Sequence, residues 1–231
     1  MNKLGLIGGT GSESTIEYYK GIEYGVQQKS GRSFFPNLTI ESLSVFDVLG
    51  FCGKQDYAGL TAYLLKGIRN LTAAGAQYAA LTGITPHIVF EELSKASPIP
   101  LVSMVDTARD CAAAHGYKKI CLLGTLPTME GTFFQNSFAK RGIEVVTPNA
   151  EEKIYIGTKI ETELEYGKVL PETQRAFQEI AERIIREEQV QAVVLGCTEL
   201  PLIFDGVELP VSYIDVMQVH IRTLIDLILS V

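Results

Sequence analysis

Apolar and polar residues follow two recurring patterns along the chain. Short, almost uninterrupted apolar runs are typical of strands buried on both faces, and longer segments with apolar residues every three or four positions are typical of helices. The expected strands are Lys3–Gly9, Asn37–Val45, Ala76–Gly83, Pro100–Met104, Lys118–Gly124, Ile143–Pro148, Val190–Gly196 and Pro210–Asp215. The expected helices are Ser14–Ser30, Tyr57–Gly75, Pro86–Ala96, Asp106–His115, Thr128–Gly142, two within Glu151–Glu188, and Val216–Val231.

Strands that alternate with helices of this length predict crossover connections and mainly parallel sheets covered on both sides, which is the α/β class. In the first helix, Ile16, Tyr19, Ile22 and Val26 are expected to share the buried face.

The two halves of the chain resemble each other. The run Leu4–Thr10 aligns with Ile120–Thr125 if one glycine is inserted, and "AQYAALTGIT" aligns with "VQAVVLGCTE", which places Gly83 on Cys197. We therefore expect two similar lobes related by a pseudo-two-fold axis, with the active site between them, where ligands meet the carboxyl ends of strands. The predicted boundaries are 1–104 and 105–214, with the closing helix 215–231 packing on the first lobe.

Composition narrows the class of protein. The 231 residues are 46% hydrophobic and 20% charged, with a net charge of −7 and no basic cluster, so a nucleic-acid partner is not expected. Neither a signal peptide nor a membrane-spanning run is indicated, and a cytoplasmic location is expected. The four cysteines show no CxxC spacing, so neither a metal site nor a disulfide framework is predicted.

One cysteine has a setting that suggests chemistry. Cys197 follows a buried strand directly, and Thr198 and Glu199 lead into a helix start. Because a helix N-terminus stabilises a thiolate, we expect the pKa of this thiol to be lowered. Cys121, inside a strand, and Cys111, on a helix among alanines, are interpreted as packing residues.

Hydroxyl side chains gather at two other strand ends. The turn after the first strand carries Thr10, Ser12 and Thr15, and it lacks the third glycine of a dinucleotide-binding loop. Free N–H groups and hydroxyls at such a turn suit a carboxylate. The turn Gly124–Glu130 carries Thr125 and Thr128, of which Thr128 is expected to cap the next helix.

At these residues the chain resembles the aspartate/glutamate racemases, a family of cofactor-independent, two-lobed enzymes. The similarity covers essentially the full chain and rests on "GLIGGTGSEST", "TPH" at Thr85–His87, "LLGTLPTME", "PNAEEK", "ELEYG" and "LGCTELPLIF". It implies two cysteines that exchange the α-proton on opposite faces of the substrate, with no cofactor and no metal. It also implies a small-molecule substrate and a homodimer.

The resemblance assigns roles position by position. Cys197 is one acid/base group, and the implied substrate contacts are Thr10, Ser12, Thr15, Ile84, Thr85, Thr125, Thr128, Thr198 and Glu199. The first-lobe cysteine is replaced by Gly83, which is expected to leave a gap beside the substrate, and Ile84 stands where an asparagine is usual. Thr82 is adjacent and is included among the catalytic candidates, although strand alternation directs it to the other face.

The sequence therefore predicts a racemase or epimerase of an acidic amino acid, asymmetric or weak because only one catalytic cysteine is present. Two alternatives stay open. One is a decarboxylase or isomerase of the same superfamily that uses a single cysteine opposite a glycine. The other is a degenerate protein that binds an amino acid without turning it over.

Overall fold

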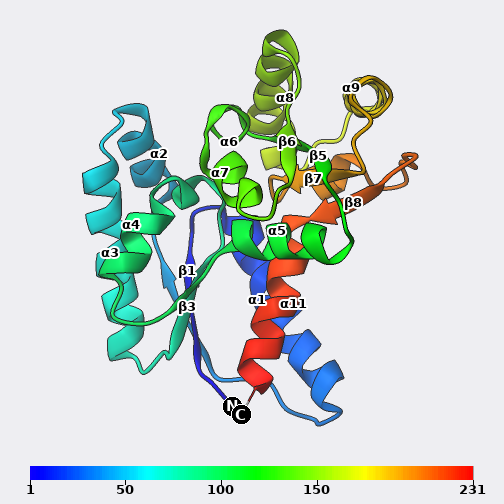
Figure 1. Ribbon diagram of the computed structural model, residues 1–231. Helices are drawn as coiled ribbons and strands as arrows, with labels where there is room; N and C mark the ends of the chain where they lie inside the picture. The colour runs from blue at the N-terminus through cyan, green and yellow to red at the C-terminus, as the bar shows by residue number, and fades with distance from the viewer. Residues whose placement is uncertain (231) are drawn as a thin grey trace. The chain divides into compact units, whose positions relative to one another are not determined.

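The computed structural model describes residues 1–230, and the chain divides into two compact units. Unit 1 consists of Met1–Met104 together with Met217–Val231, and unit 2 is the continuous segment Val105–Val216. Each unit contains one four-stranded sheet in which every strand pair is parallel, and helices cover the sheets (Figure 1). This confirms the predicted α/β class with two lobes.

In unit 1 the strand order is β2-β1-β3-β4. Its elements are β1 (Leu4–Gly8), α1 (Ser12–Ser30), β2 (Leu38–Ser42), α2 (Val45–Gly53), α3 (Tyr57–Ala73), β3 (Tyr78–Leu81), the 3-10 helix η1 (Thr85–Val89), α4 (Phe90–Ala96), β4 (Leu101–Val102) and, from the end of the chain, α11 (Val216–Leu229).

The two faces of this sheet are covered by different helices. Ile7 of β1 and Leu81 of β3 are paired neighbours, and both pack into a core with α2, α3 and α4. Leu6 and Ala80, the next pair along, point to the opposite face because side chains alternate along a strand. Figure 1 shows α1 and α11 on that second face.

In unit 2 the order is β6-β5-β7-β8. Its elements are α5 (Met104–Ala114), β5 (Lys119–Gly124), α6 (Leu126–Glu130), α7 (Phe133–Ala139), β6 (Glu144–Val146), α8 (Ala150–Thr162), the 3-10 helix η2 (Leu164–Tyr166), α9 (Pro171–Glu188), β7 (Ala192–Gly196), α10 (Leu200–Ile203) and β8 (Ser212–Asp215).

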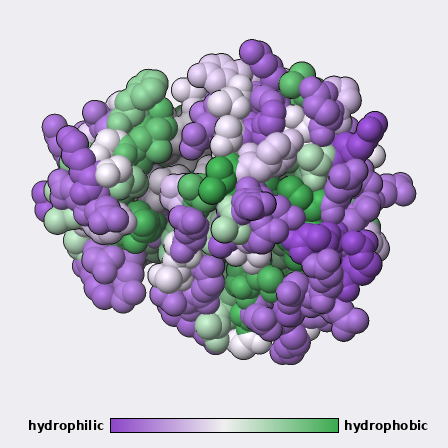
Figure 2. Space-filling view, turned by 90° about the horizontal axis from the view of Figure 1, so that it is seen from above, coloured by the Kyte–Doolittle hydropathy of each residue, from purple (hydrophilic) through white to green (hydrophobic). Residues whose placement is uncertain are grey.

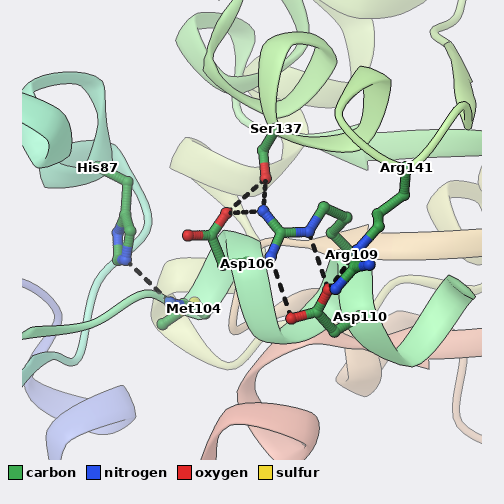
Figure 3. Close-up of polar contacts among 7 residues, drawn as sticks. All are labelled: His87, Met104, Asp106, Arg109, Asp110, Ser137 and Arg141. Carbon is green, nitrogen blue, oxygen red and sulfur yellow. Dashed lines mark hydrogen bonds and ion pairs between the residues drawn. The ribbon is translucent and has the colours of Figure 1, made fainter. Parts of the chain in front are cut away.

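A charged network joins α5 to α7 within unit 2. The guanidinium of Arg109 donates to Asp106 at 2.5 Å, to Asp110 at 3.0 Å and to Ser137 at 3.2 Å (Figure 3). Ser137 in turn donates to Asp106 at 2.6 Å, and Arg141 reaches Asp110 at 3.3 Å. The Arg109 side chain is only 13% exposed, so these acceptors compensate for its removal from water.

In each sheet, a glutamine that precedes the third strand forms the same pair of hydrogen bonds with the backbone of a lysine near the start of the first strand. The backbone N–H of Gln77 donates to Lys3 O at 2.9 Å, and its side-chain Oε1 accepts from Lys3 N–H at 2.9 Å. In unit 2, Gln191 N–H donates to Lys119 O at 2.9 Å, and its Oε1 accepts from Lys119 N–H at 3.2 Å. The equal strand orders and these matched contacts identify an internal repeat.

Several predictions for individual elements differ from the structure, including the helix Pro86–Ala96, which is divided into η1 and α4. The predicted strand Asn37–Val45 ends at Ser42, and α2 follows it. The predicted helix Thr128–Gly142 is divided into α6 and α7, because Gly131 adopts an extended conformation with ψ of 157°. Residues Ile16 and Tyr19 do not share the buried face of α1, since they are 44% and 48% exposed and Tyr18 is buried instead.

The face of the molecule seen in Figure 2 is mainly hydrophilic, with hydrophobic side chains in separate groups. Among the described residues, no helix combines the length and the hydropathy that a membrane span requires.

Candidate active site

The turn after β1 is closed by a threonine of α1. The backbone N–H of Gly9 donates to Thr15 Oγ1 at 3.0 Å, and Thr15 Oγ1 donates to Gly11 O at 2.8 Å. Gly9 and Gly11 have φ of +74° and +140°, conformations that side chains rarely adopt. The glycines therefore allow the tight turn, and Thr15 is used in holding it.

Thr82 is part of the same buried cluster at the end of β3. Its hydroxyl lies 3.1 Å from Thr15 Oγ1 and 3.2 Å from Ile7 O, and its carbonyl accepts a hydrogen bond from Ser14 Oγ at 2.5 Å. The residue is fully buried. Because Thr15 Oγ1 uses its proton on Gly11, Thr82 is the donor between the two hydroxyls or to Ile7. Protein groups thus engage the Thr82 hydroxyl.

The expected gap beside Gly83 is filled, which corrects the prediction from the sequence. A Cβ at position 83 would lie 2.7 Å from Thr10 Oγ1 and 2.8 Å from the backbone oxygen of Thr10. Both distances are too short for real Cβ contacts, and the second involves backbone that cannot easily move. Glycine is therefore the residue that fits here, and Thr10 occupies the space that a side chain would take.

The other unit 1 candidates follow either the turn after β1 or Gly83 in the sequence. Ser12 is exposed at the first position of α1, Ile84 is 6% exposed, and Thr85 is half-buried at the start of η1. Thr85 is the first residue of η1 rather than the residue that caps it, because Ile84 holds the capping position.

His87 is a buried connector and not a surface residue. Its Nδ1 lies 3.1 Å from Gly83 O, and its Nε2 accepts the backbone N–H of Met104 at 3.1 Å (Figure 3). Since Nε2 must accept from an N–H group, the proton is on Nδ1 and is donated to Gly83. The imidazole therefore fixes the carbonyl of Gly83 through a single neutral tautomer.

In unit 2 the residues after β7 form a thiol–carboxylate pair. Cys197 Sγ donates to Glu199 Oε2 at 2.9 Å, and Thr198 Oγ1 donates to the same oxygen at 2.8 Å. Cys197 is 9% exposed and belongs to the core cluster that includes Leu195 and Leu200. The thiol of Cys197, the hydroxyl of Thr198 and the carboxylate of Glu199 thus lie together in one turn, and the carboxylate accepts a hydrogen bond from each of the other two.

The state of this thiol is opposite to the one predicted from the sequence. Burial raises the pKa of Cys197 well above its usual range, and the charge and hydrogen bond of Glu199 raise it further. The N–H of Glu199 lowers the pKa by less. The short helix α10 begins only at Leu200, so Glu199 lies between the thiol and the helix start. At neutral pH the resting group is a thiol, not a thiolate.

A second carboxylate near this thiol was not selected from the sequence. Glu165 of η2 has a pKa raised by burial and by the charges of Glu199 and Glu161, and its own charge contributes to the raised pKa of Cys197. Glu165 lies in the motif "ELEYG", and this motif is the feature of the sequence that could have identified it as a site residue. The thiol therefore has an acidic environment within unit 2.

Thr125 and Thr128 form a pair of hydroxyls after β5. Their Oγ1 atoms are 3.0 Å apart, and Thr128 is buried over Gly124 and Gly196. The capping assignment is corrected: Thr125 occupies the N-cap position of α6, and Thr128 lies inside the helix.

The internal repeat allows the ends of β3 and β7 to be compared residue by residue. Gly83 and Cys197 follow Gln77 and Gln191 at the same spacing, and both stand just beyond the third strand of their sheets. The fold and these residues define a class of two-lobed α/β proteins with a single thiol at one of two equivalent strand ends.

A family model described as Asp/Glu/Hydantoin racemase matches residues 7–224, so the chain belongs to this family. A broad specificity amino-acid racemase of Bacillus subtilis (strain 168) is 24% identical over 219 residues, which cover 92% of each protein. The crystal structure of a putative Asp/Glu racemase from Yersinia pestis has a TM-score of 0.93 at 28% identity, over 100% of both chains. An aspartate racemase homologue from Pyrococcus horikoshii OT3 has a TM-score of 0.87 at 32% identity, again over 100% of both chains.

Proposed function

We propose that the chain is a cofactor-independent racemase of an acidic amino acid and that Cys197 exchanges the α-proton of the substrate. The observation that carries the proposal is the contact of 2.9 Å between Cys197 Sγ and Glu199 Oε2, at a strand end in a member of a racemase family. A thiol and a proton acceptor in direct contact are the two parts that a thiolate base requires.

The raised pKa of Cys197 makes the thiolate unfavourable, and in this proposal Glu199 offsets that cost by accepting the thiol proton. Transfer of the thiol proton to Oε2 produces a thiolate and a neutral carboxylic acid, so no net charge is added to the buried site. The thiolate then accepts the α-proton, and the electron pair of the broken C–H bond moves into the substrate carboxylate. Thr198 donates to the same oxygen of Glu199 and positions it.

The substrate carboxylates need donors, because the carbanion formed by proton loss places its charge on them. The proposed contacts are the hydroxyl residues Thr10, Ser12, Thr85, Thr125 and Thr128. Thr15 holds the turn through its hydroxyl, and Thr82 is fully buried with its hydroxyl bonded to protein groups. We therefore assign those two residues a supporting role and not a catalytic one.

The test is α-hydrogen exchange. The L and D forms of aspartate and glutamate are incubated with the protein in heavy water, and deuterium incorporation and chiral inversion are followed separately. We expect exchange with at least one enantiomer, and we expect it to persist after dialysis against chelator with no pyridoxal phosphate added. Sedimentation in the same buffer tests the proposed homodimer.

Variants at two cysteines locate the chemistry. Cys197→Ser should abolish exchange, because a serine hydroxyl is a far weaker acid than a thiol. Cys111→Ser, on the half-buried surface of α5, should leave exchange at the wild-type rate. Exchange that survives Cys197→Ser would show that another group is the base.

A single-cysteine decarboxylase is the second candidate, and the resting thiol favours it. In a decarboxylase the carbanion arises by loss of CO₂, and one neutral thiol is sufficient to protonate it. The raised pKa of Cys197 keeps that proton in place. Release of CO₂ from substituted malonates, without α-hydrogen exchange in amino acids, would favour this function over racemisation.

A further inference from the structure

We propose that Thr128 is a positioning residue: its hydroxyl donates to Thr125, so that the Thr125 hydroxyl keeps its own proton to donate to a bound carboxylate. All of the residues involved belong to unit 2. The inference rests on the proposed function and deepens it, because it narrows the role of Thr128 from a direct contact with the substrate to an action through its neighbour.

The ends of β5 and β7 place Thr125 next to the thiol. Gly124 of β5 and Gly196 of β7 are paired in the parallel sheet of unit 2. Thr125 and Cys197 are the residues that follow these two glycines. They therefore leave the same edge of the sheet on neighbouring strands, which lie about 4.8 Å apart. A hydrogen-bond donor on Thr125 would act beside the group that exchanges the proton.

Packing fixes the direction of the Thr128 side chain, which is 1% exposed. A Cβ added to Gly124 would lie 3.0 Å from Thr128 Cγ2, and a Cβ added to Gly196 would lie 3.5 Å from the same atom. The methyl group of Thr128 thus lies over both strand ends. Because threonine is branched at Cβ, a methyl group held in this place also fixes the hydroxyl, which is 3.0 Å from Thr125 Oγ1.

The direction of this hydrogen bond follows from the available partners. Among residues 1–230, Thr125 Oγ1 is the only hydrogen-bond partner of the Thr128 hydroxyl, and burial keeps water away from it. If Thr125 were the donor, the Thr128 proton would be buried without an acceptor, which is unfavourable and rare. Thr128 is therefore the donor, and the half-buried Thr125 retains a proton that it can donate elsewhere.

The Thr125 hydroxyl is not used by its own helix. Thr125 holds the N-cap position of α6, where a threonine oxygen usually accepts a backbone N–H, but its side chain forms no such bond. Its carbonyl alone accepts the N–H groups of Thr128 and Met129, each at 3.0 Å. In the proposed reaction, a donor at this position stabilises the charge that develops on the substrate carboxylate, so it acts mainly on the chemical step.

Thr128→Val tests this role, because valine keeps the methyl group and the shape of threonine but has no hydroxyl. We expect kcat for α-hydrogen exchange to fall about tenfold, with KM within about threefold of wild type. Thr125→Val removes the donor itself and should lower kcat by about 10²-fold. The double variant should be no slower than Thr125→Val, because Thr128 acts only through Thr125.

Thr128→Ser separates the hydroxyl from the methyl group. It should recover most of the exchange rate lost in Thr128→Val, yet it should melt at a lower temperature than Thr128→Val, because the methyl group over the two glycines is lost. Thr132→Val, at an exposed position just before α7, should exchange at the wild-type rate. Two results would overturn the proposal in favour of a packing role: Thr128→Ser as slow as Thr128→Val, or a further loss when Thr128→Val is added to Thr125→Val.

NMR of the hydroxyl protons in the unaltered protein decides the direction of the bond without any variant. We expect a slowly exchanging hydroxyl proton at Thr128 and a rapidly exchanging one at Thr125. The opposite pattern would contradict the proposal even if the variants do not fold. A wild-type protein without α-hydrogen exchange would instead reject the proposed function and with it the effect on rate, while the hydroxyl spectrum would still establish which threonine is the donor.

Discussion

Cys197 is kept as a neutral thiol by residues of its own turn. Burial disfavours the thiolate, and the carboxylate of Glu199 both repels the thiolate and accepts the hydrogen bond of the thiol. The same carboxylate that suppresses the thiolate at rest is the acceptor that produces it during the reaction. A single residue therefore controls both the resting state and the reactivity of the thiol.

Removing the charge of Glu199 should separate these two effects. In Glu199→Gln the thiol loses a repelling charge and a carboxylate acceptor, so its pKa should fall and the resting thiolate fraction should rise. Proton exchange should nevertheless slow by about 10²-fold or more, because the acceptor is lost. The thiolate absorbance of the variant, with Cys197→Ser subtracted, and the α-hydrogen exchange rate measure the two effects. A fall of both quantities would contradict this role of Glu199.

The sequence located the candidate site residues but could not predict their partners. Cys197 was found because a strand end and a helix start are visible in the residue pattern. The pattern does not show that Glu199 turns back onto the thiol, that Thr10 fills the space beside Gly83, or that His87 joins Gly83 to Met104. These contacts depend on side-chain directions that only the folded chain defines.

At the scale of elements, α11 packs closely on α1. Gly25 of α1 allows this approach, because a Cβ there would lie 2.3 Å from Ile225 Cδ1, and Gly21 is in a similar position against Ile221. An added methyl group at position 25 would therefore force the Ile225 side chain to move within a packed contact. The contact joins two segments from opposite ends of the chain.

Gly25→Ala should therefore destabilise unit 1 by about 1–3 kcal/mol, although alanine is the better helix former. The matched control is Gly50→Ala in α2, where nothing lies within 4 Å of the added Cβ. That variant should be neutral or stabilising by up to about 1 kcal/mol. Urea unfolding measures both. Adding Ile225→Val to Gly25→Ala should restore part of the loss, and strict additivity would argue against the contact.

The same helices enclose His220, which predicts sensitivity to acid. Tyr18 donates to its Nδ1 at 2.7 Å, and its Nε2 lies 3.2 Å from Val102 O. Burial, and secondarily His87, lower its pKa from 6.5 to about 3. Because the pKa of His220 is lower in the folded than in the unfolded protein, the unfolded state binds the proton first as the pH falls. The free energy of unfolding is therefore unaffected by this group above about pH 6.5 and decreases between about pH 6.5 and pH 3. By pH 5 the decrease is about 2 kcal/mol.

Unfolding by urea at neutral pH and at about pH 5 tests this prediction. His220→Gln should be less stable at neutral pH but should lose this part of the pH dependence, because the titrating group is absent. His115→Gln, at an exposed position just beyond α5, should keep the wild-type slope. An unchanged slope in His220→Gln would assign the acid sensitivity to other groups.

Hydrophobic periodicity predicted most elements, because a buried parallel strand leaves an apolar run that few other structures produce. The errors arise where local signals compete. Helix α2 was missed because its residues are apolar on the exposed side too, with Phe46 82% exposed and Leu49 50% exposed. In α1 the large residues Ile16, Tyr19 and Tyr24 face solvent while Glu23 is 7% exposed, so the period alone predicted a wrong face.

At the scale of the whole molecule, the units differ in how the chain builds them. Unit 2 is one continuous segment, whereas unit 1 requires residues from both ends. The two ends meet within unit 1: the N–H of Asn2 donates to Ile228 O at 3.1 Å, and the Asn2 amide donates to Leu227 O at 2.9 Å. α11 also supplies the buried residues Met217, Val219, His220, Ile221, Leu224, Ile225 and Ile228.

Fragments should reflect this difference. Residues 105–216 should fold cooperatively alone, because their sheet and core are complete. Residues 1–104 alone should be largely unfolded, because the face of α1 that α11 covers would be exposed. A permuted chain that joins 217–231 through a short linker to 1–104 should recover a cooperative transition. Circular dichroism with urea unfolding measures all three, and a stable 1–104 fragment would contradict the requirement for α11.

Because α11 follows unit 2 in the sequence, the fold also implies an order of events during protein synthesis. The ribosome delivers residues 1–104 first, yet unit 1 cannot close until its last helix has left the exit tunnel. Unit 2 has all its residues available earlier and can finish first, so the second half of the chain matures before the first. Until α11 is available, the apolar residues of α1 that it covers in the folded protein stay exposed to water.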